Sequence, residues 1–242
     1  MQDLLAKYGK VAPLLSQEQD AFTGLSTRKR SFDAGTNLVC GELDDPDQLY
    51  IVEKGRLFAS TELANGERAI TRLYFAGDIV GTANIPFEHA TQTITVNASA
   101  ELYIFPRKNL IDTFTNMPRV AAIFYTFAAM ENAILNDRLV SIGRTRGKAR
   151  LASLILEIEA RRNLLLDPAR ERIDLGLTQA EIGDAIGLTE VQVSRLFRQF
   201  IEDGIVERRH GQTKILDRGR LSKIGQFTDR YDDLDLDWFE DA

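Results

Sequence analysis

The chain of 242 residues is 44% hydrophobic and 27% charged, which is the balance of a globular protein with a buried core. Its single cysteine, Cys40, excludes a disulfide framework and an iron–sulfur cluster held by the cysteines of one chain. The net charge is −6, yet residues 138–228 hold 17 basic and 12 acidic side chains, so one segment carries an excess of positive charge.

The compartment is indicated by the cysteine content and by the first residues. A chain without disulfides is typical of a reducing environment, so we expect a cytoplasmic protein. Residues Met1–Lys10 lack the basic and then apolar layout of a secretory signal, and no apolar run is long enough to span a bilayer. We therefore expect no membrane partner.

Residues 1–117 predict an N-terminal helical segment followed by a sensor domain made of strands. Residues 1–27 have apolar side chains at mixed three- and four-residue steps, and Ser16–Gln19 has the composition of a capping box. From Arg28 to Pro106 short β-rich runs alternate with glycine turns, and Asn65-Gly66 between two runs is a strong hairpin signal. The pattern predicts an antiparallel β-roll of the jelly-roll type within an α+β fold.

A long dimerisation helix and hinge are predicted over residues 118–142. Pro118 suits a first helical turn, and an apolar stripe then steps by four, three and four residues. Such a stripe often pairs with its copy in a dimer; the alternative is packing against the chain's own barrel. The pattern breaks at Ser141–Gly143, the expected hinge. The residues expected at the homodimer interface are Ile123, Phe127, Met130 and Ile134.

Residues 143–223 predict a second domain that is mostly helical. Its first helix has an apolar face that includes Leu151 and Ile155, and Val206–Leu216 has the pattern of a hairpin with Gly211-Gln212 at its tip. Residues 224–242 form an acidic C-terminal tail. A charge run is usually a solvated terminus, but the apolar pair Trp238-Phe239 could instead dock onto the basic domain.

The stretch 178–200 has the pattern of a helix-turn-helix. Thr178 with Glu181 forms one capping box and Thr189 with Gln192 forms another, and each marks a helix start. A glycine stands where the first helix must end, and another where the helices cross. The apolar positions that two crossed helices bury together are Ile182, Ile186, Leu188, Val193 and Leu196. The sequence therefore predicts that this domain binds double-stranded DNA, with helix 189–200 in the major groove.

The outward side of the second helix carries the candidate base contacts. Arg195 is the best base reader, because its guanidinium can bond guanine O6 and N7 together. Val191 could touch a thymine methyl group, and the basic residues around the hairpin, with Arg198, would hold phosphates and fix the register. The predicted DNA-binding residues are Thr178, Gln179, Thr189, Glu190, Val191, Gln192, Ser194, Arg195, Arg198, Arg208, Arg209 and Lys214.

The order of barrel, long helix, hinge, helix-turn-helix and wing resembles the Crp/Fnr superfamily of bacterial transcription regulators. The resemblance covers roughly residues 28–221. It implies a cyclic-nucleotide-binding-like β-roll, a dimerisation helix and a winged helix, and a homodimer that binds a palindromic promoter site and contacts RNA polymerase. The motifs that carry it are Leu49–Gly55, Asn65-Gly66, Phe75–Gly81, Ser141–Arg144, Ala149–Ala152, Thr178–Arg195 and the wing at Gly211.

One departure from the superfamily concerns the cyclic nucleotide. Its cyclic-nucleotide receptors carry Gly-Glu and Arg-Ser/Thr pairs around the phosphate, whereas here Gly81 is followed by Thr82 and the arginine position reads Thr91-Gln92. A bound phosphate needs a cation or a helix N-terminus to replace its water. No arginine lies between Arg72 and Arg107, so we expect no response to cyclic AMP.

Two further departures concern the cluster and the recognition helix. Oxygen sensors of the superfamily hold an iron–sulfur cluster with four cysteines, so no cluster is expected here. Family members often have Glu where this chain has Val191, whereas the arginine that reads guanine is retained as Arg195. We expect a guanine in each half-site with a different neighbouring base preference.

The effector is left open by the sequence. Haem-sensing relatives exist, and His89 could be a ligand, although a lone surface histidine is the simpler interpretation; His210 falls in the wing. Cys40 could be a redox switch, but its acidic neighbours oppose a low thiol pKa. We expect no cofactor, with haem or an unidentified small effector as the alternative.

Two other function classes compete with a DNA-binding regulator. An enzyme is not expected, because the chain has two distant histidines, one cysteine and no nucleophile-elbow or phosphate-loop pattern. The second alternative is an effector- or haem-sensing protein of the same fold that binds a ligand or partner rather than DNA. Arg195 and the basic wing argue against it.

Overall fold

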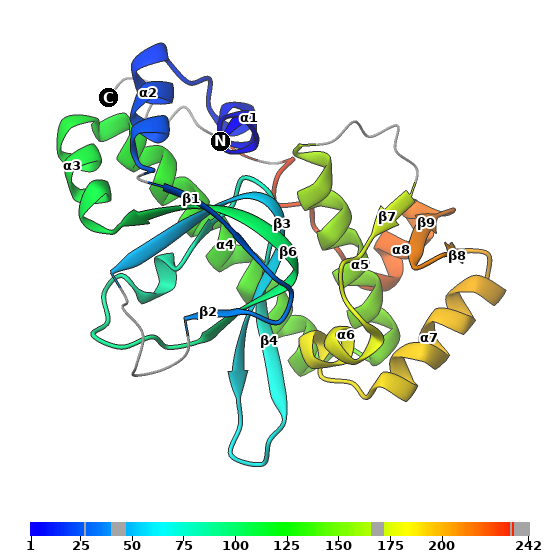
Figure 1. Cartoon of the computed structure of the whole chain (residues 1–242). Helices are drawn as coiled ribbons and strands as arrows, with labels where there is room; N and C mark the ends of the chain where they lie inside the picture. The colour runs from blue at the N-terminus through cyan, green and yellow to red at the C-terminus, as the bar shows by residue number, and fades with distance from the viewer. Residues whose placement is uncertain (27, 40–46, 166–171, 233, 235–242) are drawn as a thin grey trace. The chain divides into compact units, whose positions relative to one another are not determined.

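The computed structural model describes residues 1–26, 28–39, 47–165, 172–232 and 234 (Figure 1). The chain divides into two compact units, the first built mainly from residues 1–62 and 71–130 and the second mainly from Glu131 onward. Cys40 and the Trp238-Phe239 pair lie outside the described residues.

The first unit contains the predicted antiparallel sheet domain. Its six-stranded sheet has the order β1-β6-β3-β4, with β2 paired to β6 and β5 to β3. The turn at Asn65-Gly66 joins β3 and β4 as predicted, with Gly66 at a φ of 81° and the Leu63 amide donating to the Glu67 carbonyl at 2.8 Å. The strands are β1 (Arg28–Phe32), β2 (Asn37–Val39), β3 (Gln48–Glu62), β4 (Arg68–Tyr74), β5 (Ile79–Val80) and β6 (Thr93–Pro106).

Apolar side chains on one face of these strands make the core of the first unit. In β3, Tyr50, Val52, Leu57 and Ala59 are buried in one cluster with side chains of β6. Ile51 and Phe58, which point to the other face, are buried as well, so β3 is covered on both faces. A glycine in β3 permits the bend between these runs: Gly55 has a φ of 93°, and a Cβ there would lie 2.5 Å from the Ser99 carbonyl oxygen.

Three helices gather near the first half of α4 in Figure 1: α1 (Gln2–Val11), α2 (Ser16–Gly24) and α3 (Lys108–Asn116). The predicted capping box is displaced by one residue. The N-cap of α2 is Leu15, whose amide donates to the Glu18 carboxylate at 2.7 Å, whereas the Gln19 side chain bonds the Leu14 carbonyl.

A buried ion pair attaches α1 to the sheet. The Lys7 ammonium pairs with the Asp78 carboxylate, and the two side chains are 6% and 3% exposed. The second carboxylate oxygen of Asp78 accepts from the Phe75 amide at 2.8 Å, so this charge is held from two sides.

The stripe predicted to pair in a dimer lies on the buried face of α4 (Pro118–Arg144). Ile123, Phe127, Met130 and Ile134 are at most 7% exposed within one chain. The Tyr8 ring of α1 stacks on the Phe127 ring at 4.0 Å. The stripe therefore packs against its own chain, which was the alternative, and leaves almost no surface for a partner.

The predicted hinge is also displaced. Helix α4 continues through Ser141–Gly143 to Arg144, because Gly143 has ordinary helical geometry and meets no obstacle within 4 Å. The break comes at Thr145 and Arg146, before α5 begins.

The second unit combines helices with a small sheet of order β7-β9-β8, which Figure 1 shows beside α7 and α8. The tip of the β8–β9 hairpin is His210-Gly211, both at positive φ, one residue before the predicted tip. The elements are α5 (Gly147–Asn163), β7 (Arg172–Asp174), α6 (Gln179–Ile186), α7 (Glu190–Glu202), β8 (Val206–Arg209), β9 (Gln212–Ile215) and α8 (Arg218–Gly225).

Four charged side chains join the second half of α4 to α5. Arg138 donates to Glu157 at 2.7 and 2.9 Å, and Arg161 donates to Glu131 at 3.0 and 2.7 Å. Arg161 also donates to Glu157 at 3.2 Å, so the four side chains form one connected and largely buried network of ion pairs. These paired and hydrogen-bonded charges link the second half of α4 to α5.

Lys7→Met should destabilise the first unit strongly. The substitution leaves the Asp78 carboxylate buried without its cation, and breaking a buried pair in this way costs about 3–5 kcal/mol. Thermal and urea unfolding measure the loss. Lys10→Met, at an exposed position of the same helix, is the control and should change stability by less than about 1 kcal/mol. Equal effects of the two substitutions would contradict the assigned role of the pair.

Candidate nucleic-acid interface

Two capping boxes fix the starts of α6 and α7, as predicted. The Thr178 hydroxyl accepts from the Glu181 amide at 3.2 Å, and the Glu181 carboxylate accepts from the Thr178 amide at 2.8 Å. Thr189 and Gln192 repeat the arrangement at 3.3 and 2.9 Å. These side chains position the helices, because their polar atoms are already engaged within the chain.

Two glycines set the angle between α6 and α7. Gly187 ends α6 in the left-handed conformation, at a φ of 66°. A Cβ on Gly183 would lie 2.3 Å from the Leu188 carbonyl oxygen, so α6 and the turn approach each other more closely than any side chain allows. Both glycines have the roles that the sequence predicted.

The two sides of α7 are chemically different. Val193, Leu196, Phe197 and Phe200 are buried against the rest of the second unit. The outward side is polar and charged apart from Val191, which is 78% exposed, and Ile201 near the end of the helix, which is 46% exposed. Its exposed residues are Glu190, Val191, Gln192, Arg195, Arg198, Gln199, Ile201 and Glu202, and Ser194 is half-buried beside them.

Arg195 and Arg198 are the two cations on the outward side of α7. Both are exposed, and within the described residues neither forms an ion pair. Their guanidinium groups are therefore available to an anionic or acceptor-rich ligand. Gln199, which the sequence-based set omitted, is exposed one helical turn after Arg195; the four-residue spacing was the available signal.

The three predicted phosphate contacts of the wing, which is the β8–β9 hairpin, lie in different environments. Arg209 is exposed near the hairpin tip. The Arg208 guanidinium lies 4.2 Å from the centre of the Phe197 ring, and burial lowers the pKa of Arg208 from its usual value. Lys214 is half-buried on β9 and stands opposite Glu207, so its charge is partly balanced inside the sheet. Helix α6 contributes Gln179, which is half-buried.

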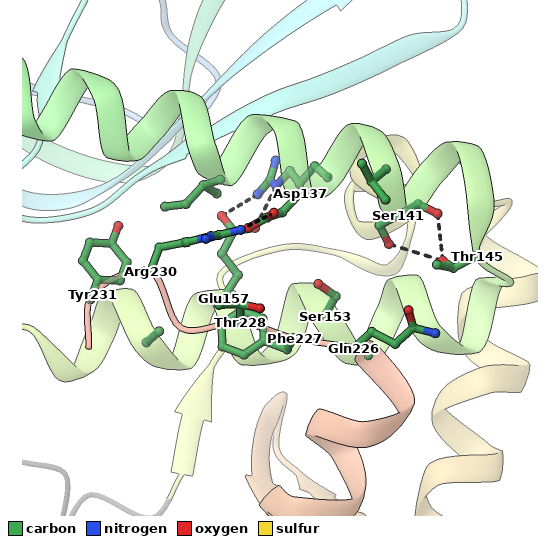
Figure 2. Close-up of a pocket in the computed structure, with 15 residues that line it drawn as sticks. Asp137, Ser141, Thr145, Ser153, Glu157, Gln226, Phe227, Thr228, Arg230 and Tyr231 are labelled. Atoms are coloured by element: carbon green, nitrogen blue, oxygen red, sulfur yellow. Dashed lines mark hydrogen bonds and ion pairs between the residues drawn. The ribbon is translucent and has the colours of Figure 1, made fainter. Parts of the chain in front are cut away.

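After α8 the chain returns along α4 and α5 and closes a small cavity (Figure 2). Arg230 donates to both carboxylate oxygens of Asp137 at 2.7 and 2.8 Å, and Asp229 lies 3.5 Å from the Arg218 guanidinium. Burial raises the pKa of Asp229. This segment of the acidic tail is thus attached to helices of the second unit, while residues 233 and 235–242 lie outside the described residues.

The cavity beside Arg230 is too small for a nucleotide-sized effector. Its volume is about 130 Å³, whereas sites for organic ligands measure roughly 300–1,000 Å³. Polar side chains that line it include Ser141, Ser153 and Thr228. No sequence pattern predicts this cavity, because its walls come from three separate segments.

The predicted departure from a cyclic-nucleotide site has a structural counterpart in the first unit. Gly81 precedes a single turn of 3-10 helix, η2 (Thr82–Asn84). The Asn84 side-chain Oδ1 accepts from the backbone amide and the hydroxyl of Thr91 at 3.1 and 3.0 Å, and the Gln92 side-chain Nε2 donates to the Thr71 hydroxyl at 3.0 Å. Neutral groups that bond one another occupy the positions where the receptors carry charge.

The two histidines lie on the surface. His89 is exposed in the segment between η2 and β6, and His210 is exposed at the wing tip. Among the described residues no group of three or more His, Cys, Asp or Glu side chains has the arrangement of a metal site. In the same part of the chain, no helix combines the length and the apolar character needed to cross a membrane.

Comparison with protein families assigns both units. Residues 149–224 match the Crp-like helix-turn-helix domain, and residues 29–116 match the cyclic nucleotide-binding domain. Together the two matches span the winged helix and most of the sheet domain.

Individual proteins agree with this assignment. The chain is 29% identical to the transcriptional regulatory protein btr of Bordetella pertussis over 188 residues, which are 76% of this chain and 77% of that protein. It is 23% identical to the fumarate and nitrate reduction regulatory protein of Escherichia coli over 215 residues, 89% of this chain and 85% of that one. The structure of FixK2 from Bradyrhizobium japonicum superposes with a TM-score of 0.73 at 23% identity, covering 81% and 96% of the two chains.

Gly183→Ala should destabilise the second unit. A Cβ would overlap the Leu188 carbonyl oxygen, and overpacking of this kind costs about 1–3 kcal/mol, which exceeds the gain of up to about 1 kcal/mol for alanine in a helix. Unfolding followed by circular dichroism measures the change. Gly219→Ala in α8 is the matched control, because its Cβ would meet only ordinary contact at 3.7 Å. A Gly183→Ala protein as stable as wild type would refute the close crossing.

Proposed function

We propose that this chain, which belongs to the Crp/Fnr family of DNA-binding transcription regulators, binds palindromic promoter DNA as a homodimer and places α7 of each protomer in the major groove. The observation that carries the proposal is the outward side of α7, where Arg195 and Arg198 are exposed without ion-pair partners among the described residues. Helix α6 packs closely across α7 and holds it in place, so the outward side of α7 can enter the major groove of a DNA duplex.

Within this proposal Arg195 reads a guanine in each half-site. Its guanidinium offers parallel donors that match O6 and N7. Val191 lies one turn earlier on the same side and is free to meet a thymine methyl group. Arg198 and Arg209 hold phosphates, while Arg208 supports the wing through its contact with Phe197.

The dimer forms through the outer face of α4, not through the stripe that the sequence suggested. The exposed residues on this face step alternately by three and four residues, which is the spacing of a coiled-coil seam. The apolar members with large side chains are between 43% and 68% exposed. The face, called the α4 seam below, consists of Tyr125, Ala128, Asn132, Leu135, Leu139 and Ile142.

The bound dimer acts on transcription by contacting RNA polymerase, as the family resemblance implies. We propose that cyclic AMP is not its signal, because the Thr91 and Gln92 side chains bond neutral neighbours where a phosphate would need a cation. The competing function, a ligand sensor that does not bind DNA, predicts no salt-dependent affinity for any duplex.

Arg195→Ala should weaken specific DNA binding by about 1–3 kcal/mol and relax the preference at one base pair of each half-site. Duplexes selected from a random pool by the wild-type protein supply the site, and fluorescence anisotropy measures affinity for every single-base variant of it.

Arg198→Ala is the comparison for that experiment. Loss of a phosphate contact should weaken binding to all sequences alike and reduce the slope of log affinity against log salt by about 1. If Arg195→Ala instead produced this uniform loss with base preference intact, the two roles would have to be exchanged.

Leu135→Asp combined with Leu139→Asp should convert the dimer into monomers. Each substitution would place a charge at the centre of the α4 seam, where it could not be hydrated in a dimer. Sedimentation velocity measures the mass. Leu63→Asp is the control, since Leu63 is similarly exposed, at 50%, on the β3–β4 turn. A dimer that survives the double substitution would place the interface elsewhere.

A further inference from the structure

The α4 seam contains one polar residue, and its position has a consequence for how two copies pair. In the alternating spacing, Tyr125, Asn132 and Leu139 occupy a positions, and Ala128, Leu135 and Ile142 occupy d positions. Asn132 is exposed, and within the described residues its amide makes no hydrogen bond to another side chain or to the backbone. A carbonyl oxygen and an amino group are therefore presented at the middle of an otherwise apolar face.

The flanks of the seam offer no charges that could select the partner's orientation. In many coiled coils, ion pairs between e and g positions do this. Here the e positions are uncharged, being Ala129, Asn136 and Gly143. The g positions are Phe124, Glu131 and Arg138.

The two charged g residues, Glu131 and Arg138, already form ion pairs within their own chain. The Glu131 carboxylate accepts two hydrogen bonds from Arg161, and Arg138 donates two to Glu157. Their side chains are 10% and 14% exposed, so neither is available to a second chain. Orientation and register must then be specified from within the seam.

We propose that Asn132 pairs with Asn132 of a second copy and so fixes a parallel, in-register dimer. Only a parallel, in-register pair sets the two Asn132 side chains opposite each other. In that position each amino group can donate to the carbonyl oxygen of the other side chain. A shift by one heptad would set the amide against Tyr125 or Leu139, and an antiparallel pair would set it against a d residue. In each case a polar group would be buried without a partner.

The parallel arrangement matters for the proposed function, on which this inference rests. Helix α4 has 27 residues and is about 40 Å long. An antiparallel pair would put the two DNA-binding domains at opposite ends of the paired helices, where they could not share one palindrome. Asn132 would thus couple the pairing of α4 to the spacing of the two recognition helices.

The test is disulfide cross-linking through Leu135→Cys in a Cys40→Ser background, on the full-length protein. In a parallel, in-register dimer the two introduced thiols face each other at a d position. We expect efficient cross-linking, a marked loss of it when Asn132→Leu is added, and a dimer that is nonetheless at least as stable by sedimentation. Asn136→Leu, four residues away at an e position, is the matched control and should leave the cross-link yield unchanged.

A second pair of variants measures the proximity directly. Asn132→Asp should raise the dimer dissociation constant by at least about tenfold at pH 7, because two carboxylates would face each other, and the loss should reverse as both are protonated at low pH. Asn136→Asp should show neither effect.

The outcomes separate the inference from the proposed function. A wild-type chain that stays monomeric at every concentration refutes the dimer and the pairing together. A dimer whose Asn132→Leu form keeps the same cross-link yield and the same affinity for the palindrome refutes only the role of Asn132.

Discussion

The close crossing of α6 and α7 is the constraint on which the DNA-binding surface depends. The Gly183 position lies so near the Leu188 carbonyl that no side chain fits, and two capping boxes define where each helix begins. Because α7 is fixed along its inner side by Val193, Leu196, Phe197 and Phe200, its outer side is rigid without contributing to the core. Arg195 and Arg198 can therefore serve recognition alone.

Helix α4 carries two apolar stripes, one that packs within the fold and one through which we propose that two copies associate. The stripe through Phe127 packs against α1, where the Tyr8 ring stacks on the Phe127 ring. Lys7 of the same helix α1 forms the buried ion pair with Asp78. The opposite stripe has the same heptad spacing and is exposed in one chain. The buried charges between α4 and α5 support the helix from a third side and neutralise the residues that would otherwise flank the seam.

Local patterns in the sequence predicted the helix-turn-helix well, because its geometry is set by residues within 25 positions of one another. Capping pairs, a left-handed glycine and a glycine at the crossing all act locally, and all have the predicted roles. The hairpin at Asn65-Gly66 was predictable for the same reason. The small shifts at α2 and at the wing tip reflect backbone choices that side-chain composition does not determine.

The contacts that sequence reasoning missed are those made between distant segments. Nothing in the spacing of α4 distinguishes the stripe that contacts α1 from the one that is exposed, since Tyr8 and Phe127 are 119 positions apart. The same holds for the tail residue Arg230, which bonds Asp137, 93 positions earlier in the chain. Long-range packing decided each case.

The spacing of the two half-sites tests the central claim most directly. A parallel dimer holds its two recognition helices a fixed distance apart, so the half-sites of a selected palindrome should sit about one helical turn, or 10–10.5 base pairs, apart. Inserting five base pairs between them turns one half-site to the opposite side of the duplex. We predict that specific affinity then falls to the level of a single half-site. Unchanged affinity for the altered duplex would contradict recognition by two α7 helices presented together.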